Sequence, residues 1–200
     1  METCYIFGAG CGLPQKLTPL KGDLVIAADA GLRSLEKLNI SPDIIIGDFD
    51  SLCRVPDGKE VITFPKKKDD TDTLLAVKKG FEKGYKSFKI YGGTGGRADH
   101  TFANIQTLLY ISERGGQGFL YGDNFTASVI TNGEISFDGQ SGNISVFSLS
   151  DKSEGVNIKG LLYEAESLTL KNSFPLGVSN EFINKKAHIS VEKGSLLIIF

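Results

Sequence analysis

Short apolar runs alternate with amphipathic segments along the first part of the chain. Six runs with a strand pattern lie at residues 4–7, 24–29, 43–48, 60–64, 87–92 and 118–122. Between them, residues 30–38, 71–84 and 98–115 carry apolar side chains at helical spacing. Repetition of strand, helix and strand predicts an α/β domain with a mainly parallel sheet and flanking helices.

The pattern changes after residue 123. Short alternating segments lie at residues 125–130, 134–137, 143–149, 167–170, 187–191 and 195–200, separated by Gly, Asn, Ser and Asp turns. This pattern is typical of a small all-β domain, either an antiparallel sandwich or a barrel. We therefore expect an α/β domain over 1–123 and an all-β domain over 124–200. A β domain of that size is marginal alone, which favours docking or dimerisation.

Composition narrows the range of partners and locations. The 200 residues are 40% hydrophobic and 23% charged with a net charge of -2, so the overall balance does not indicate nucleic acid or a membrane surface as a partner. The sequence lacks an apolar stretch of roughly 18 residues and a secretion signal. Cys4, Cys11 and Cys53 are odd in number and lack CxxC spacing, which fits reduced thiols. We expect a cytoplasmic protein.

Two carboxylates follow a buried strand in "IIIGDFDS", residues 44–51. Ligands of an open parallel sheet lie beyond the carboxyl ends of its strands, which is where Asp48 and Asp50 fall. In an extended chain the two side chains point to the same side, and Mg²⁺ between them would offset their repulsion. A pair of solvated turn residues is the alternative. This segment alone leaves both interpretations open.

A second charged segment, "KKKDDTD" at residues 66–72, precedes the second predicted helix. In one interpretation Asp69 or Asp70 caps the helix and Asp72 stabilises its positive end. In the other, the segment supplies a further metal carboxylate and lysines that neutralise phosphate. The two interpretations are compatible.

The most specific segment is "GGTGGRADH", residues 92–100. Four glycines let backbone amides approach an anion closely, and the start of the following helix adds its positive end. Arg97 can bind a phosphate through two hydrogen bonds. A glycine-rich turn that allows tight packing between the strand and the helix is the alternative. The segment has neither a Walker pattern nor GxGxxG spacing, so it favours phosphate binding by another design.

We expect different roles for the two histidines. His100 could act as a general base, or it could position Asp99 or a substrate through hydrogen bonds. His188 lies in an alternating strand segment, which favours a surface or structural role. The chain does not show a Ser-His-Asp order or a reactive-cysteine context, so nucleophilic catalysis has little support.

Taken in order, "ADAG", "GDFDS", "KDDTD" and "GGTGGRADH" resemble the motif series of the thiamine pyrophosphokinases. The resemblance covers the whole chain, because that family joins an α/β catalytic domain to a β-sandwich that binds thiamine. It implies Mg²⁺-dependent transfer of the pyrophosphoryl group of ATP to the hydroxyl of thiamine, giving thiamine diphosphate and AMP.

The resemblance also implies roles for individual residues. The metal ligands would be Asp48, Asp50 and Asp72. ATP would be bound by Asp29, Lys68, Asp69, Thr71, Gly92, Gly93, Gly95, Gly96 and Arg97. Catalysis would involve Asp48, Asp50, Asp72, Arg97, Asp99 and His100. Thiamine would contact Asp99, His100, Tyr163, Ser179 and Asn180.

In the second domain, "GLLYEAES" at 160–167 and "GVSNEF" at 177–182 resemble the thiamine-binding elements of the family. Tyr163 would stack on the pyrimidine ring and Ser179 and Asn180 would form hydrogen bonds; alternatively, Tyr163 is a core residue and the other two form a turn. The resemblance implies a homodimer whose active sites lie between one subunit's catalytic domain and its partner's sandwich.

Two departures from the family pattern bear on substrate affinity. Ala30 stands where the family usually has glycine, and the chain has no tryptophan for stacking. Two other functions stay open from the sequence alone. One is a pyrophosphokinase or nucleotidyl-type enzyme that acts on another alcohol. The other is a non-catalytic module that senses a nucleotide or binds thiamine.

Overall fold

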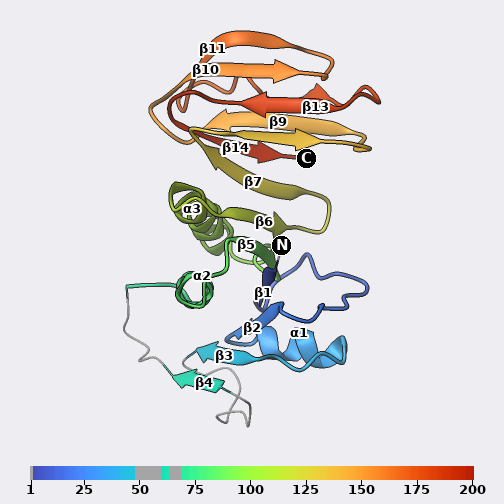
Figure 1. The fold of residues 1–200 in the computed structure, drawn as a ribbon, viewed down its shortest axis with the longest axis vertical. Helices are drawn as coiled ribbons and strands as arrows, with labels where there is room; N and C mark the ends of the chain where they lie inside the picture. The colour runs from blue at the N-terminus through green and yellow to red at the C-terminus, as the bar shows by residue number, and fades with distance from the viewer. Residues whose placement is uncertain (1, 48–59, 64–68) are drawn as a thin grey trace. The chain divides into compact units, whose positions relative to one another are not determined.

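A computed structural model describes residues 2–47, 60–63 and 69–200 of the chain. The chain divides into two compact units, Met1–Asn124 and Phe125–Phe200 (Figure 1). Four residues singled out by the sequence lie outside the described residues: Asp48, Asp50, Cys53 and Lys68.

The first unit alternates strands and helices as predicted. Its elements are β1 (Thr3–Phe7), β2 (Leu24–Ala28), α1 (Gly31–Lys37), β3 (Ile44–Gly47), β4 (Glu60–Thr63), α2 (Asp72–Glu82), β5 (Ser87–Tyr91), α3 (Ala98–Glu113) and β6 (Gln117–Tyr121). The strands pair in the order β6-β5-β1-β2-β3-β4, and all these pairs are parallel. The prediction of a mainly parallel sheet with flanking helices is confirmed.

The strand order reverses beside β1. From β1 the chain adds β2, β3 and β4 in one direction, and then returns to place β5 and β6 on the other side of β1. Phe7 at the end of β1 is in register with Tyr91 at the end of β5. The loops after these two strands therefore leave the same edge of the sheet side by side, and such a reversal point is where open α/β sheets bind ligands.

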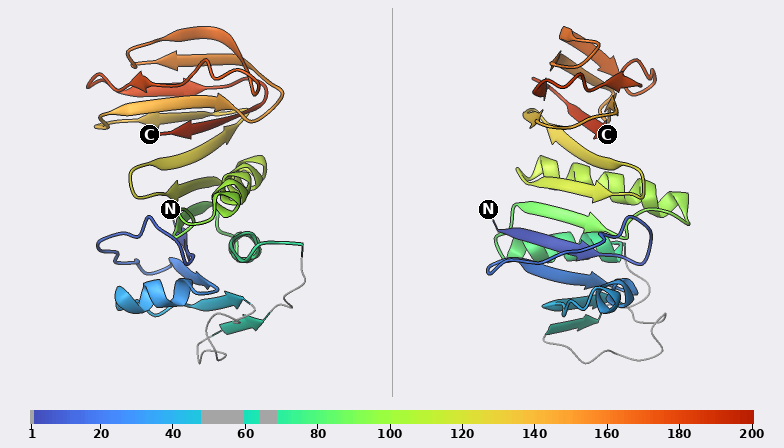
Figure 2. Two further views of the ribbon diagram at one scale, coloured as in Figure 1. Left: turned by 180° about the vertical axis from the view of Figure 1, so that it is seen from behind. Right: turned by 90° about the vertical axis from the view of Figure 1, so that its right-hand side faces the viewer.

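Helices cover both faces of this sheet, because successive strand residues point to opposite sides. Leu35 of α1 packs with Tyr5 and Phe7 on one face. On the other face α2 approaches so closely that a side chain on Gly80 would meet Phe88 and Cys4. Figure 2 shows α1 on one side of the strands and α2 and α3 on the other.

An aromatic stack crosses three neighbouring strands, β1, β5 and β6, on the α1 face. The ring centroids of Phe7 and Tyr91 lie 5.2 Å apart, and those of Tyr91 and Tyr121 lie 4.5 Å apart with an interplanar angle of 12°. Burial and the neighbouring tyrosine hydroxyl raise the pKa of Tyr91 far above its ordinary value. Tyr91 is the middle ring of this stack and the residue before the glycine-rich segment, so the stack anchors the strand from which that segment leaves.

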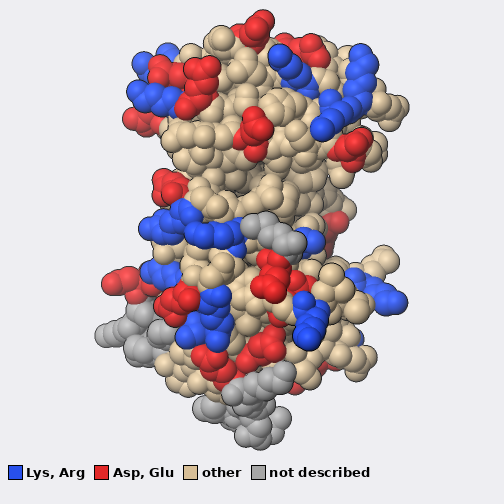
Figure 3. Space-filling view, in the orientation of Figure 1, with Lys and Arg blue, Asp and Glu red and all other residues tan. Residues whose placement is uncertain are grey.

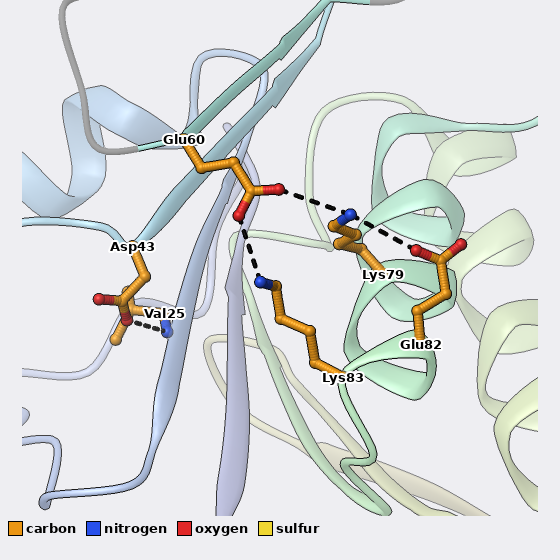
Figure 4. Close-up of polar contacts among 6 residues, drawn as sticks. All are labelled: Val25, Asp43, Glu60, Lys79, Glu82 and Lys83. Carbon is orange, nitrogen blue, oxygen red and sulfur yellow. Dashed lines mark hydrogen bonds and ion pairs between the residues drawn. The ribbon is translucent and has the colours of Figure 1, made fainter.

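The edge strand β4 is held to α2 by charged side chains (Figure 4). Glu60 accepts from Lys83 at 3.2 Å and lies 3.5 Å from Lys79, which also pairs with Glu82 at 3.5 Å. Charges suit an edge strand because they discourage pairing with another chain. These contacts are partly exposed, so each adds little stability by itself.

The second unit consists of two four-stranded sheets. One has the order β12-β9-β14-β7 and the other β11-β10-β13-β8, and all described pairs within them are antiparallel. The strands are β7 (Thr126–Thr131), β8 (Glu134–Phe137), β9 (Asn143–Ser148), β10 (Lys152–Lys159), β11 (Ala165–Lys171), β12 (Asn180–Glu181), β13 (Ala187–Ser190) and β14 (Ser195–Ile199).

The interior of this unit combines a few aromatic rings with aliphatic side chains. The ring of Phe137 lies edge-on to Phe182, at 5.6 Å between centroids, and to Phe200, at 4.8 Å. Ile144, Val156, Ile189 and Leu196 are also buried. The prediction of a small antiparallel β domain is confirmed.

Acidic and basic side chains are interspersed over the face shown in Figure 3, in keeping with the net charge of -2. Within the described part of the chain, none of the helices is long and apolar enough to cross a membrane.

Candidate active site

A cavity of about 710 Å³ opens at the carboxyl ends of β1, β2 and β5, beside the point where the strand order reverses. Its walls are the loops that follow these strands and the first turns of α2 and α3. The residues that line it are Gly8, Ala9, Gly10, Ala28, Asp29, Asp70, Thr71, Asp72, Thr73, Gly92, Gly93, Thr94, Gly95, Arg97, His100 and Asn104. The cavity therefore gathers three of the four motifs that the sequence singled out.

The glycine loop, Gly92–Gly96, lies against the first loop, Gly8–Gly12. The N–H of Gly10 donates to the carbonyl of Gly92 at 2.7 Å, and the N–H of Cys11 donates to the carbonyl of Thr94 at 2.7 Å. The first loop was not singled out from the sequence. Its pattern, "GAGCG" directly after a strand, carried the same signal as "GGTGG".

Glycine is required in both loops because their backbones touch. A Cβ on Gly92 would lie 2.2 Å from the carbonyl oxygen of Gly8, and one on Gly10 would lie 2.2 Å from that of Thr94. Gly92 and Gly95 also have φ of 65° and 80°, a region that favours glycine. The glycines thus serve the packing of one loop on another, rather than the packing of a strand on a helix that was the alternative interpretation. Bare backbone also lines the cavity, so phosphate binding stays a prediction.

Arg97 and Asp99 form an exposed pair at the start of α3. Nε of Arg97 lies 3.1 Å from Oδ1 of Asp99, and its terminal nitrogen lies 2.5 Å from Oδ2. The hydrogen bonds from the guanidinium hold the pKa of Asp99 below its usual range. A phosphate that binds Arg97 through the same two nitrogens, Nε and this terminal nitrogen, must therefore displace the carboxylate of Asp99.

Two further side chains of α3 line the cavity. His100 is exposed, and its backbone N–H donates to Asp99 Oδ1 at 3.0 Å. Asn104, one turn further along, is buried and donates to the carbonyl of Gly93 at 2.7 Å. Sequence reasoning missed Asn104, although its place four residues after His100 puts both on one helix face.

The structure corrects one interpretation of the segment before α2. The helix cap is Thr71, whose hydroxyl accepts the N–H of Leu74 at 3.2 Å, and neither Asp69 nor Asp70 caps the helix. Asp70 instead pairs with Lys78 at 2.6 Å. Thr71 is the cap because it directly precedes the first helical residue, and a cap must occupy that position. Asp72 lies in the first turn of the helix, as expected.

Asp29 lies at the end of β2 with φ of 50°, and its N–H donates to the carbonyl of Ile46 at 2.7 Å. A Cβ on Gly47 would lie 3.0 Å from Cα of Asp29, so glycine lets β3 end close beside it. Ala30 has φ of -66°, which alanine adopts without strain. The departure from glycine at residue 30 therefore has no backbone cost here.

Carboxylates at this edge of the sheet provide hard oxygen donors. Asp72, a predicted metal ligand, and Asp29, a predicted ATP-binding residue, both line the cavity. The other predicted metal ligands, Asp48 and Asp50, are outside the described residues. Among the residues described, three or more His, Cys, Asp or Glu side chains do not come together at one point. Oxygen ligands of this kind suit Mg²⁺.

In the second unit, Asn180 fixes the turn that carries Tyr163. Asn180 Oδ1 accepts the N–H of Tyr163 at 2.9 Å, and Nδ2 donates to the carbonyl of Tyr163 at 2.7 Å. Asn180 is buried, whereas Tyr163 is 65% exposed and is not a core residue. Ser179 has φ of 60°, and its N–H donates to Ser145 Oγ at 3.1 Å.

Cys11 lies at the rim of the glycine loop, where its Sγ occupies the space that a Cβ on Gly95 would need. The charge of Asp123 raises the pKa of this thiol. Asp123 also accepts the N–H of Gly12 at 2.8 Å, which ties the first loop to the end of β6.

Comparisons with known proteins agree with this arrangement. Residues 20–118 match the sequence model of "Thiamin pyrophosphokinase, catalytic domain", and residues 133–196 match "Thiamin pyrophosphokinase, vitamin B1 binding domain". A thiamine pyrophosphokinase of Bacillus subtilis is 30% identical over 100% of this chain and 98% of its own. The chain belongs to the thiamin pyrophosphokinase family. The resemblance carried by the sequence motifs is confirmed.

Other family members extend the likeness. Thiamin pyrophosphokinase 1 of Caenorhabditis elegans is 27% identical over 80% of this chain and 69% of its own. The crystal structure of the Bacillus subtilis thiamine pyrophosphokinase has a TM-score of 0.85 at 28% identity, covering 99% of this chain and 98% of that one. The thiamin pyrophosphokinase of Candida albicans shares the fold alone, with a TM-score of 0.74 at 17% identity over 99% and 88% of the two chains.

Proposed function

We propose that the chain transfers the pyrophosphoryl group of ATP to the hydroxyl of thiamine, giving thiamine diphosphate and AMP. One observation carries the proposal: a single cavity unites the glycine loop, Arg97 and Asp72. Family membership supports the same reaction. In that reaction the thiamine oxygen bonds to the β-phosphorus, the bond from that phosphorus to the α-phosphate oxygen breaks, and AMP leaves.

The cavity provides the positioning and charge neutralisation on which phosphoryl transfer depends. Backbone N–H groups of the glycine loop and the N-terminal end of α3 attract the triphosphate. Arg97 neutralises phosphate charge once it exchanges Asp99 for a phosphate oxygen. Asp99, released in that exchange, is then available to accept a hydrogen bond from the thiamine hydroxyl.

Product analysis tests this reaction directly. Purified protein given ATP, Mg²⁺ and thiamine should form AMP and thiamine diphosphate in equal amounts. Formation of ADP and thiamine monophosphate would rule out pyrophosphoryl transfer. Turnover with another alcohol and none with thiamine would favour a different pyrophosphokinase, and binding without turnover would favour a sensing module.

Magnesium belongs to the same proposal. Asp72, with Asp48 and Asp50, would hold the ion, and Asp29 adds a fourth carboxylate nearby. When bound, Mg²⁺ would neutralise phosphate oxygens as charge shifts toward the AMP leaving group. The test is Asp72→Asn, which should lower turnover by about a hundredfold or more and raise the Mg²⁺ concentration needed for half-maximal rate. An unchanged Mg²⁺ dependence would remove Asp72 from the ligand set.

The second unit, residues 124–200, is proposed to bind thiamine in a homodimer. Exposed apolar side chains support this: Leu162, Tyr163, Phe174, Leu176 and Val178 are each half exposed or more. On α3 of the first unit, Phe102 is 60% exposed near the cavity residues. A partner's sandwich would cover such side chains and bring Tyr163 to the ATP site of the other subunit.

Subunit mixing tests this arrangement. Asp72→Asn damages the catalytic unit and Tyr163→Ala damages the thiamine unit, so each homodimer should be weakly active at low thiamine. Mixed dimers would contain one intact site if sites are shared, and an equal mixture should regain roughly a quarter of wild-type activity. No gain on mixing, or a fully active monomer, would contradict a shared site. A cytoplasmic location is also proposed, supported by the free thiols of Cys4 and Cys11.

A further inference from the structure

Asn104 is the side chain that reaches the glycine loop from α3. It is 5% exposed, lines the cavity and donates from Nδ2 to the carbonyl of Gly93 at 2.7 Å. The neighbouring carbonyls, those of Gly92 and Thr94, accept from backbone N–H groups of the first loop. Among the described hydrogen bonds, the carbonyls of Gly92 and Thr94 thus have backbone donors, whereas the carbonyl of Gly93 has a side-chain donor.

The directions of these carbonyls decide what the loop offers to a phosphate. In a trans peptide the C=O and the next N–H point in opposite directions, and the described residues contain no cis peptide. With the carbonyls of Gly92 and Thr94 directed at the first loop, the N–H groups of Gly93 and Gly95 point away from it. A carbonyl that turned toward the phosphates would repel them, whereas an N–H attracts them.

The peptide after Gly93 is the one most able to rotate in this loop. Gly93 has no side chain to restrict rotation of this peptide, and it sits between two other small residues of the loop. It is also tightly enclosed on the α3 side: a Cβ there would lie 2.7 Å from Leu120 Cδ1 and 3.0 Å from Asn104 Nδ2. Asn104 therefore sits where its amide both fits against Gly93 and satisfies the carbonyl.

We propose that Asn104 is a positioning residue that keeps the Gly93 carbonyl turned toward α3 and away from the phosphates of the nucleotide. It acts through the glycine loop and does not touch the reacting atoms. This inference rests on the proposed function, because it assigns ATP to this cavity.

Thr107 provides a matched control on the same helix. It is 3% exposed, and its hydroxyl donates to the carbonyl of Ala103 within α3 at 3.0 Å. Asn104→Ala and Thr107→Val each remove one buried hydrogen bond, but only the first releases the glycine loop. The melting temperatures of the two variants measure how much of any effect is general destabilisation.

The measurement is calorimetric binding of an ATP analogue with a methylene group between the α- and β-phosphorus, which cannot react. Asn104→Ala should raise its Kd roughly tenfold or more, as expected when a buried carbonyl loses its donor. Thr107→Val should leave the Kd within about twofold. The KM for thiamine should be unchanged in both. Equal Kd values for the two variants would overturn the inference.

Asn104→Asp provides a second test if the alanine variant does not fold. The side chain keeps its shape but, when ionised, has no proton to donate to Gly93. A protonated carboxyl can donate, so the Kd of this variant relative to wild type should improve as the pH falls. A ratio that does not change with pH would overturn the inference. If wild type binds the analogue and forms AMP while these variants behave normally, the inference fails and the proposed function stands; if wild type does neither, the proposed function itself fails.

Discussion

The glycine loop of the first unit and the Tyr163 turn of the second, residues 160–164, are two segments proposed to bind ligands, and they are held in different ways. The carbonyls of Gly92 and Thr94 are bound by another stretch of backbone. The Tyr163 turn is bound at its N–H and its carbonyl by one side chain, Asn180. In the glycine loop, which is proposed to bind phosphate through its backbone, several residues share the hydrogen bonds that restrain it. In the Tyr163 turn, which is proposed to bind thiamine through a ring, the buried amide of Asn180 fixes the backbone and the ring is exposed to solvent.

The largest effect should come from filling the space between the two glycine-rich loops. Gly92→Ala places a Cβ 2.2 Å from the carbonyl oxygen of Gly8 at a φ of 65°, so we expect loss of more than about 3 kcal/mol of folding free energy and of nearly all activity. Denaturant unfolding and AMP release measure the two effects.

Gly96→Ala is the control for that substitution. Gly96 has a similar φ of 64°, but a Cβ there would meet nothing within 4 Å. Only the backbone strain should remain, about 1 to 2 kcal/mol. Equal losses in the two variants would mean that contact between the loops contributes nothing.

The next effect concerns the amide of the second unit. Asn180→Ala removes three hydrogen bonds, two to Tyr163 and one from the N–H of Glu181, so we expect a loss of about 2 to 3 kcal/mol and a higher KM for thiamine. Asn157 is the matched control, since its amide also joins two backbone segments, at Gly155 and Ser167. Asn157→Ala should lower stability while the thiamine KM stays unchanged.

Removing the ring itself should separate binding from stability. Tyr163 is 65% exposed, so Tyr163→Ala should change the unfolding free energy by less than about 0.5 kcal/mol. The thiamine KM should rise about tenfold, because one stacking contact is lost, and Tyr163→Phe should retain most of the affinity. A normal KM in the alanine variant would show that this turn does not face thiamine.

The smallest effect should come from the charged contacts at β4, which neither ligand segment uses. Hydrogen bonding to Lys83 holds the pKa of Glu60 below its usual value. A lowered folded-state pKa adds stability above the ordinary glutamate pKa of about 4.3, and this is lost as the pH falls through the folded value. Glu60→Gln should therefore lower the melting temperature slightly at pH 7, and the difference should vanish at low pH and in high salt. A pH-independent difference would point to packing as its cause.

How far the sequence predicts this molecule differs between the units. In the first, the alternation of apolar runs and helical spacing located every described strand and helix. Most of these elements have a buried side that shows in the pattern, and β4, which is only partly buried, still carries the apolar pair Val61 and Ile62. In the second, β10 and the two-residue strand β12 were missed. The reason is clearest for β10. Ser153 is fully buried there yet polar, and Gly155, at φ of 64°, coincides with a shift in strand register that breaks the alternation. Burial of a hydrogen-bonded serine leaves no apolar signal.

The candidate site shows the same division. Residues at strand ends could be placed in advance, since parallel strands end at one edge, and Asp29, Asp72 and Arg97 do line one cavity. Contacts such as Asn104 to Gly93 and Lys78 to Asp70 depend on the position of a helix face relative to a loop. The spacing of residues along the chain does not determine that position.

Cys11 lies where chemical modification would disturb the proposed nucleotide site. Its sulfur packs against the glycine loop, so oxidation or alkylation would add bulk beside the backbone that is proposed to bind phosphate. The nucleophile in such reactions is the thiolate, and the carboxylate of Asp123 disfavours that form by raising the thiol pKa. Iodoacetamide should therefore label Cys11 more slowly than it labels a free cysteine. The carboxylate that secures the first loop thus also shields an exposed sulfur from electrophiles.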